Sequence, residues 1–291
     1  VHQPRKNRRI VTGSATKVRE PATVWDNFRD YGQLDIDLDN PRVREHRNWY
    51  ARNGRYLNRV LNQAEPYWYH IQSEAIRRGL PPELALIPII ESGYNPVARG
   101  RGPTGLWQFM PGTARILGLR QNGWYDGRLD VVASTDAALR YLETLNSHFD
   151  GDWLLTLAAY NAGEGTIKNA IAANRRRGQP TDFWSLNLRA VTRNYIPKMI
   201  ALTQVLNDPA RFQLTLPPIP NYPYFVSVET GGQIGLNEAS RMAGVSVAEL
   251  RRLNSGLRGN ATDPAGPHRL MVPVGSAERF RQELASTPPS Q

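Results

Sequence analysis

Glu91 closes an apolar stretch of the chain, residues 84–90, which reads Leu-Ala-Leu-Ile-Pro-Ile-Ile. Burial in apolar surroundings disfavours the charged form of a carboxyl group and raises its pKa. A raised pKa suits a general acid that works near neutral pH. On this feature alone, a glutamate that leaves a buried helix for solvent is the simpler interpretation.

Three segments near or downstream of Glu91 supply side chains of the kinds that bind sugars. Residues 92–96 form a turn with hydroxyl, amide and aromatic groups, and residues 105–110 and 159–163 each combine glycine, a large aromatic side chain and an amide. Aromatic faces suit stacking on sugar rings, and amides suit hydrogen bonds to N-acetyl groups. Each segment alone is weak evidence, because such aromatic side chains could equally pack in a core.

Taken together and in this order, the segments 91–96, 105–111 and 159–163 resemble the motifs of the family 1 lytic transglycosylases, the soluble-lytic-transglycosylase type. Residues 194–198, Asn-Tyr-Ile-Pro-Lys, look like the fourth motif of that family. The four motifs cover residues 67–205 and are specific as a set.

The Trp-Gln-Phe at 107–109 and a small C-terminal module make the chain look most similar to the membrane-bound D branch of that family. The resemblance implies a mainly helical, lysozyme-like fold in which Glu91 is the catalytic acid and base and Tyr195 helps to fix it. The residues that it implies at the substrate-binding cleft are Ser92, Asn95, Gly105, Leu106, Trp107, Gln108, Phe109, Met110, Tyr160, Asn161 and Tyr195.

The resemblance also implies a mechanism with one carboxylate. Glu91 would protonate the oxygen between N-acetylmuramic acid (MurNAc) and N-acetylglucosamine (GlcNAc), with help from the muramic N-acetyl group. It would then take the proton of the C6 hydroxyl, which closes on C1 to give a 1,6-anhydroMurNAc end. Most glycosidases use a second carboxylate as nucleophile or base. None of the other carboxylates of this region belongs to a motif that requires a carboxylate at that position. They are Asp126, Asp130, Asp136, Glu143, Asp150, Asp152 and Glu164.

Two other functions fit the same residues. A goose-type-like lysozyme would hydrolyse the same bond with a positioned water molecule and a second acid. A non-catalytic peptidoglycan-binding protein would bind the glycan without cutting it, although the intact Glu91 argues against this.

Composition limits the partners that we expect. The chain has no cysteine, and its five histidines show no paired metal-ligand spacing, so we expect no metal and no organic cofactor. The net charge of +10 suits an anionic wall polymer, peptidoglycan glycan strands. Nucleic-acid binding is not expected, because the arginines form no known reading motif. We expect a monomer.

The elements that must position these residues are predicted to be helices as far as residue 213. Amphipathic spacing predicts helices over 42–62, over 66–78 with Pro66 in the first turn, and over 131–149. No alternating strand pattern precedes residue 215. Further helices are expected from Pro81-Pro82 to Glu91, over 105–117 with an interruption at Pro111-Gly112, over 153–160, from Gly165 to Ala173, and over 190–206.

We expect five parts along the chain. Residues 1–20 read as a flexible basic leader, 21–213 as the helical domain, 214–223 as a proline-rich linker, 224–284 as a small α+β module, and 285–291 as a polar tail.

The module loosely resembles a LysM domain, a βααβ carbohydrate-binding unit. Residues 243–254 and 270–273 match that pattern best, whereas residues 230–234 and the long loop 258–267 depart from it. Glycan binding and packing against the catalytic domain therefore both remain open for the module.

The family resemblance implies export to the periplasm and association with the outer membrane through an N-terminal lipid anchor. The given sequence begins at Val1 and contains neither a signal peptide nor a cysteine that could carry a lipid.

Overall fold

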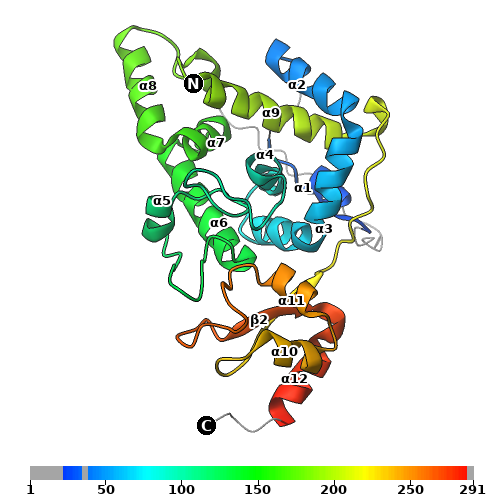
Figure 1. The fold of residues 1–291 in the computed structure, drawn as a ribbon. Coiled ribbons are helices and arrows are strands. Elements are labelled where there is room, and N and C mark those ends of the chain that lie inside the picture. Colours follow the sequence, from blue (N-terminus) through cyan, green and yellow to red (C-terminus); the bar gives the residue numbers. More distant parts are fainter. Residues whose placement is uncertain (1–21, 35–38, 287–291) are drawn as a thin grey trace, which may run out of the picture.

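The computed structural model describes residues 22–34 and 39–286 and places a helical body above a smaller C-terminal module (Figure 1). The leader expected at 1–20 and residues 287–291 of the expected tail lie outside the described residues. The helical body comprises α1 (Val24–Tyr31), α2 (Pro41–Arg52), α3 (Gly54–Arg77), η1 (Pro82–Leu86), α4 (Ile87–Ser92), α5 (Pro111–Ile116), α6 (Val131–His148), α7 (Trp153–Ala162), α8 (Glu164–Arg176), η2 (Phe183–Ser185), α9 (Ala190–Asn207) and η3 (Ala210–Phe212).

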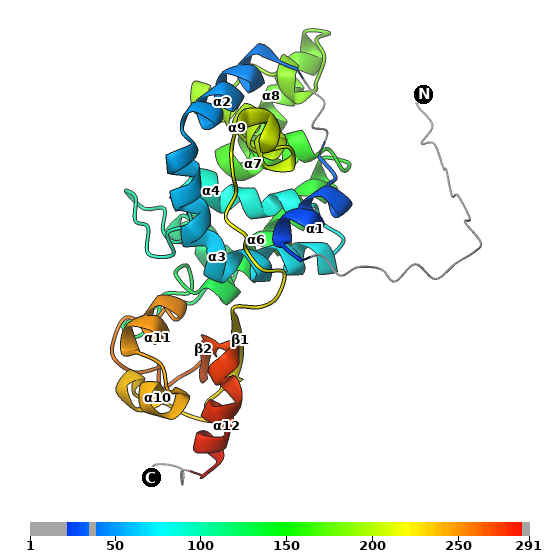
Figure 2. The same ribbon diagram turned by 90° about the vertical axis from the view of Figure 1, so that its right-hand side faces the viewer.

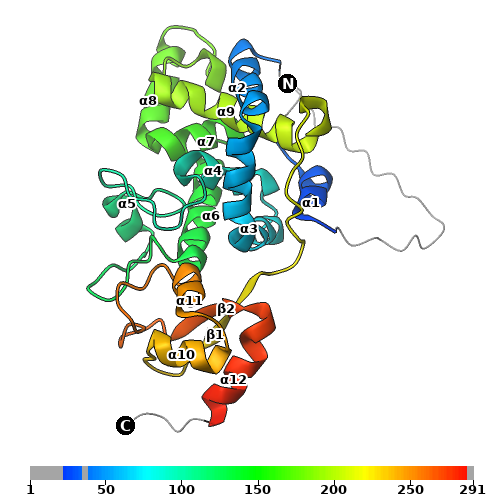
Figure 3. The same cartoon turned by 45° about the vertical axis from the view of Figure 1, so that its right-hand side comes forward.

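The short helix α4 lies in the middle of this body. It packs against η1 and α9, while α9 also packs against α2 and α7. The views in Figures 1 and 3 show the longer helices arranged around it. The helix that carries Glu91 is therefore held from several sides by longer helices with buried apolar faces.

The helix predicted over 42–62 breaks at Asn53, and the next helix runs unbroken through Pro66. The backbone N–H of Asn53 donates to the carbonyls of Trp49 and Tyr50, at 3.0 and 3.1 Å, which ends α2. Pro66 lies inside α3 rather than at a first turn, so that prediction was wrong. An interior proline costs a helix about 3 kcal/mol. Burial of large apolar side chains such as Trp68 and Ile71 stabilises α3 by about 1.5–3 kcal/mol each and outweighs this cost.

The helix predicted over 105–117 is confined to α5, residues 111–116. Residues 104–109 instead form a tight loop closed by an isolated antiparallel bridge between Thr104 and Phe109. Gly105 has φ +84° and Gln108 has φ +49°, values that a right-handed helix does not allow. The apolar spacing of this segment reflects burial of a loop and not a helical face.

The C-terminal module has the expected strand–helix–helix–strand order and a core of its own. Its elements are β1 (Phe225–Glu229), α10 (Leu236–Ala243), α11 (Val247–Leu253), β2 (Arg269–Pro273), η4 (Val274–Ser276) and α12 (Ala277–Ser286). The two strands are antiparallel, with Phe225 opposite Pro273 and Glu229 opposite Arg269. We did not predict α12, which completes the module by burying Phe280 fully in its core.

The proline-rich segment 214–223 packs along the helical body. Ile219 is 2% exposed, and its carbonyl accepts the N–H of Val24 at 3.1 Å. The indole N–H of Trp25 donates to the carbonyl of Pro217 at 2.8 Å. The segment runs down the side of the body in Figure 2, and its contacts with α1 fix the path by which the chain reaches the module.

The module is joined to the helical body through residues 120–130, the loop that precedes α6. The N–H of Asp126 donates to the carbonyl of Gly256 at 2.8 Å, and the hydroxyl of Ser255 donates to the carbonyl of Leu129 at 2.6 Å. The N–H of Arg258 donates to the carbonyl of Trp124 at 2.8 Å. Backbone pairing of this kind fixes the module against the body.

A buried ion cluster centred on Asp126 lies at this junction. The carboxylate is 0% exposed and accepts two hydrogen bonds from the guanidinium of Arg128, at 3.0 and 2.9 Å, and one from its backbone N–H, at 3.2 Å. Arg258 of the module donates a further hydrogen bond at 3.2 Å. Burial raises the pKa of Asp126, but the hydrogen bonds and charge of Arg128 outweigh burial and hold that pKa below its ordinary value. Asp126 therefore stays ionised and acts as a structural anchor.

Replacing Asp126 with asparagine keeps the shape of the side chain and removes its charge. We expect Asp126→Asn to lower the free energy of unfolding by about 3 kcal/mol, because the buried Arg128 loses its counter-charge. The matched control is Asp136→Asn, whose pairs with Arg78 and Arg140 involve a carboxylate that is 48% exposed, with an expected loss of about 0–1 kcal/mol. Urea unfolding measures both free energies of unfolding. Equal decreases in the two variants would show that the buried ion cluster stabilises the protein no more than an exposed ion pair does.

Candidate active site

Glu91 lies near the C-terminal end of α4 with part of its surface open to solvent. Its carboxylate oxygen Oε1 accepts the hydroxyl of Tyr195, from α9, at 2.8 Å. Burial raises the pKa of Glu91, and the Tyr195 hydrogen bond and the charge of Lys198 offset this only in part. The group can therefore hold a proton at a higher pH than an ordinary glutamate, as a general acid requires.

The backbone turns sharply after α4. Gly93 and Tyr94 both have φ +60°, so two successive residues adopt the left-handed conformation. The Tyr94 side chain is fully buried, its hydroxyl donates to the carbonyl of Ala85 at 2.7 Å, and its ring stacks on Trp68 at 5.6 Å. These contacts anchor the turn and hold the end of α4, and so Glu91, in place.

Tyr160 and Tyr195 are the two phenols of the site. Burial raises the pKa of both well above the ordinary value, and the negative charge of Glu91 raises them further. Both phenols therefore remain neutral hydrogen-bond donors near neutral pH. The hydroxyl of Tyr160 donates to the carbonyl of Trp107 at 2.8 Å and so ties α7 to the loop 104–110.

The loop 104–110 offers mainly backbone to the site. Leu106, Trp107 and Phe109 are at most 3% exposed, and the Trp107 indole N–H donates to the hydroxyl of Thr135 at 3.1 Å. Their side chains therefore belong to the core, and contact with a substrate would have to come from their backbone. Met110 is 49% exposed and free to face a ligand.

Three further polar residues predicted in the cleft have different surroundings. The hydroxyl of Ser92 donates to the carbonyl of Pro88 at 3.1 Å, within its own helix. The side-chain oxygen of Asn95 accepts the N–H of Val97 at 3.1 Å. Asn161 follows Tyr160 at the end of α7, and its buried Oδ1 has no hydrogen-bond partner among the described residues. The role of all three in substrate binding stays a prediction.

The fixed conformation of the loop depends on Gly105 and Gln108. The carbonyl of Gly105 accepts the side-chain amide of Gln108 at 2.8 Å, within the loop itself. A Cβ atom on Gly105 would lie 1.9 Å from the carbonyl oxygen of Arg128. Only glycine fits there, since both the space and the positive φ exclude a side chain.

A pocket of about 410 Å³ adjoins the Glu91 helix, and none of its lining residues was among the site residues predicted from the sequence. The available sequence signal was Trp49, a large aromatic residue that lies outside the apolar positions 43, 50, 57 and 61 of the helix predicted over 42–62, and the structure leaves it 43% exposed. Lys198 belongs to the fourth motif and lowers the pKa of Glu91, yet it was not among the predicted site residues. The pocket is lined by Glu45, His46, Trp49, Tyr50, Arg52, Tyr56, Ile89, Ile90 and Lys198.

Five of the seven other carboxylates considered as partners of Glu91 are engaged elsewhere, and no side-chain hydrogen-bond or ion-pair partner is seen for Glu143 or Asp150 among the described residues. Asp130 caps α6 by accepting the N–H of Ala133 at 2.8 Å, and Asp152 caps α7 by accepting the N–H of Leu155 at 3.0 Å. Glu164 pairs with His148 at 2.9 Å. Together with Asp126 and Asp136, these groups already have structural partners, which favours a mechanism with one carboxylate.

The described residues contain neither a metal-binding cluster nor a membrane-spanning helix. Within residues 22–34 and 39–286, no three histidine, aspartate or glutamate side chains are grouped so that they could hold a metal ion. No helix in these ranges combines the length and apolar character needed to cross a bilayer.

Comparisons with known proteins agree with this geometry. Residues 69–183 match the family model of the transglycosylase SLT domain, and residues 224–288 match that of the LysM-like domain of lytic transglycosylase MltD. The chain thus contains an SLT transglycosylase domain followed by a LysM-like domain of the MltD type.

Individual relatives support the same family. The chain is 42% identical over 272 residues to membrane-bound lytic murein transglycosylase D of Escherichia coli strain K12, covering 93% of this chain and 60% of that protein. A protein of Alteromonas sp. strain M-1, named for tributyltin chloride resistance, is 43% identical over 138 residues, which are 46% of this chain and 67% of that protein. Peptidoglycan transglycosylase gp16 of Escherichia phage T7 is 38% identical over 112 residues, 38% of this chain and 8% of the phage protein.

We expect Gly105→Ala to destabilise the protein, because the new Cβ would collide with the Arg128 carbonyl and the backbone would be strained. Overpacking of this kind costs about 1–3 kcal/mol, and a positive φ on a non-glycine residue adds about 1–2 kcal/mol. The matched control is Gly112→Ala in α5, where nothing lies within 4 Å, and it should be neutral or stabilising. Denaturant unfolding of both variants measures the difference in the free energy of unfolding. A Gly105→Ala protein as stable as the wild type would contradict the tight packing around Gly105.

Proposed function

We propose that this protein is a lytic transglycosylase of peptidoglycan, a carbon–oxygen lyase that cuts the MurNAc-β-1,4-GlcNAc bond and leaves 1,6-anhydroMurNAc ends. The observation that carries the proposal is the carboxyl of Glu91, its pKa raised by burial and one of its oxygens bonded to Tyr195 at 2.8 Å. The match to the transglycosylase SLT domain indicates the chemistry that such a group performs. Remodelling of the cell wall is the role that follows.

The first step is a proton transfer from Glu91 to the bridging oxygen. Because burial raises the pKa of Glu91, its carboxyl group stays protonated to a higher pH than that of an ordinary glutamate. The bond from C1 of MurNAc to this oxygen breaks, and the GlcNAc fragment leaves as an alcohol. The muramic N-acetyl group stabilises the positive charge that develops at C1.

The second step returns the proton to Glu91. The C6 hydroxyl of the same MurNAc attacks C1, and the Glu91 carboxylate takes its proton, so no water is consumed. The hydroxyl of Tyr195 stabilises the carboxylate between the two steps. One group serves as acid and then as base because both steps require a similar pKa.

The two alternatives are less well supported. Hydrolysis by a lysozyme-like route calls for a second acid, and Asp126, Asp130 and Asp152 are bound in structural roles. A pure binding protein has no need for a buried carboxyl held by a phenol, an arrangement that costs stability.

The setting follows from the substrate. We infer a periplasmic protein associated with the outer membrane, since a relative bears the name of a membrane-bound murein enzyme. The partners are peptidoglycan glycan strands, the working form is a monomer, and neither a metal nor an organic cofactor is required.

Digestion of purified peptidoglycan followed by mass analysis of the muropeptides tests the reaction. We expect products one water molecule lighter than those that carry reducing ends. Glu91→Gln should lower their rate of formation by about 10²–10⁴-fold, the usual contribution of a general acid and base.

The matched control is Glu65→Gln, an exposed position on α3, which should cut at the wild-type rate. Reducing ends in place of anhydro ends would establish the lysozyme. No release of fragments would leave a binding protein, and wild-type activity of Glu91→Gln would refute the role of Glu91.

A further inference from the structure

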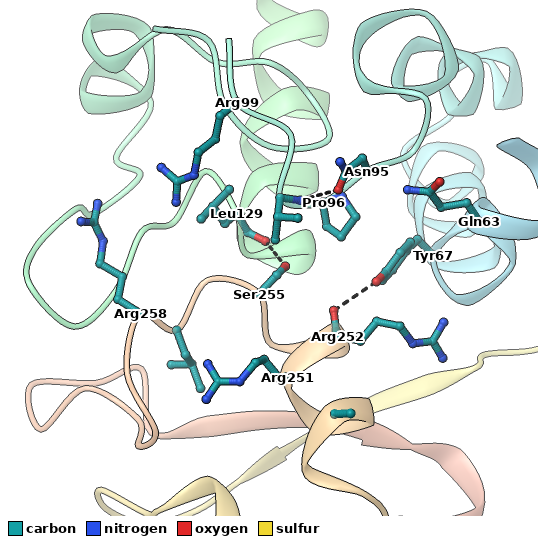
Figure 4. A pocket seen from close by; sticks show the side chains of 13 residues that line it. Gln63, Tyr67, Asn95, Pro96, Arg99, Leu129, Arg251, Arg252, Ser255 and Arg258 are labelled. Carbon is teal, nitrogen blue, oxygen red and sulfur yellow. Dashed lines mark hydrogen bonds between the residues drawn. The ribbon is translucent and has the colours of Figure 1, made fainter. Parts of the chain in front are cut away.

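A groove of about 720 Å³ lies between the helical body and the module (Figure 4). One wall comes from Gln63 and Tyr67 of α3 and from the segment 95–99 that follows the Glu91 helix. The other wall comes from residues 248–258 of the module. Neither part of the chain forms this groove alone.

Four guanidinium groups line the groove, from Arg99, Arg251, Arg252 and Arg258. Arg252 pairs with Glu249 at 2.7 Å, and Arg258 with Asp126 at 3.2 Å. Arg99 and Arg251 have no ion-pair partner among the described residues. Arg251 donates only to neutral acceptors, the carbonyl of Gly259 at 3.3 Å and the side chain of Asn260. The groove therefore carries two uncompensated positive charges, one from each wall.

The groove is preformed. The hydroxyl of Tyr67 donates to the carbonyl of Arg252 at 3.1 Å, and the hydroxyl of Ser255 donates to the carbonyl of Leu129 at 2.6 Å, so each wall is bonded to the other. Both bonds appear as dashed lines in Figure 4, where Arg99 reaches in from above and Arg251 and Arg258 from below. A rigid site loses little entropy when it binds a ligand.

The groove adjoins the catalytic centre along the chain. Asn95, in the groove wall, comes four residues after Glu91. An extended chain spans about 3.6 Å per residue, so the two Cα atoms lie within about 14 Å of each other. A glycan strand bound at Glu91 would hold groups that branch from its sugars near this groove.

We propose that this groove binds the carboxylates of the peptide stem on N-acetylmuramic acid, with Arg99 and Arg251 as their ion partners. The inference rests on the proposed function and names the part of the substrate that the junction between body and module recognises. Guanidinium groups match carboxylates in bidentate geometry, and the aromatic and apolar floor made by Tyr67, Leu129 and Leu257 suits the aliphatic parts of a peptide.

Binding without turnover tests the groove directly. We would titrate the full chain carrying Glu91→Gln with a soluble glycan tetramer that bears tetrapeptide stems, and in parallel with chitotetraose, which has no carboxylate. Adding Arg99→Gln and Arg251→Gln should weaken binding of the stem-bearing tetramer about tenfold or more, the usual effect of losing charged hydrogen bonds, and leave chitotetraose unchanged. The matched control is Arg176→Gln with Arg177→Gln, which removes the same charge from an exposed site at the end of α8.

The outcomes separate cleanly. Equal weakening of both ligands, no weakening, or the same weakening in the control pair would overturn the proposal. The proposal would also be overturned if the arginine variants lost the same affinity for tetramers without peptide stems, because these ligands carry only the lactyl carboxylate. Arg99→Lys with Arg251→Lys keeps both charges but loses the bidentate geometry, so its affinity for the stem-bearing tetramer should lie between that of the arginine pair and that of the glutamine pair. Thermal unfolding should be unchanged in both double variants.

Failure of the proposed function gives a different result. If the wild-type chain releases no anhydro product from the stem-bearing tetramer, but the arginine variants still lose affinity for it selectively, the enzyme assignment fails and the groove stands. If the wild-type chain cuts and the arginine variants bind both ligands normally, the groove assignment fails alone.

Discussion

The carboxyl group of Glu91 sits between opposing influences on its protonation. Burial at the end of α4 favours the neutral acid, whereas the hydroxyl of Tyr195 at 2.8 Å and the charge of Lys198 favour the anion. Burial prevails, yet the anion keeps a dedicated donor. Acid–base catalysis by one residue needs both properties, because the group must release a proton and later recover it. The helices around α4 serve to hold this balance in place.

The module takes part in the same arrangement through the loop 120–130. The guanidinium of Arg128 binds the carboxylate of Asp126 and donates to the carbonyl of Gly102 at 3.2 Å. The backbone carbonyl of Arg128 packs directly against Gly105. Arg258 reaches the same Asp126 carboxylate from the module. Arg128 thus links Gly102 and Gly105 to the buried ion cluster that also includes Arg258 of the C-terminal module. The module can therefore pack against the helical body and also take part in substrate recognition. The junction between them contains the ion cluster that joins the two parts and the basic groove proposed to bind the peptide stem.

Local patterns in the sequence were sufficient for the ordered motifs, for α6 and α9, and for the βααβ order of the module. Features that depend on tertiary packing were not predictable. Pro66 looked like a helix start, but the buried face of α3 carries the helix through it. Trp107 looked like a ligand contact, and only the fold shows its indole bonded to Thr135 in the core. The groove joins residues more than 150 positions apart along the chain, so no local signal could have revealed it.

Direct titration of Glu91 gives the sharpest test of its acid–base role. Carbon-13 NMR of labelled glutamate carboxyls, assigned by comparison with Glu91→Gln, would follow this one group in the wild type and in Tyr195→Phe. We predict a pKa above the ordinary 4.5 in the wild type and a higher one in Tyr195→Phe, because the lost hydroxyl had stabilised the anion. A wild-type pKa at or below 4.5, or a fall in Tyr195→Phe, would contradict the mechanism.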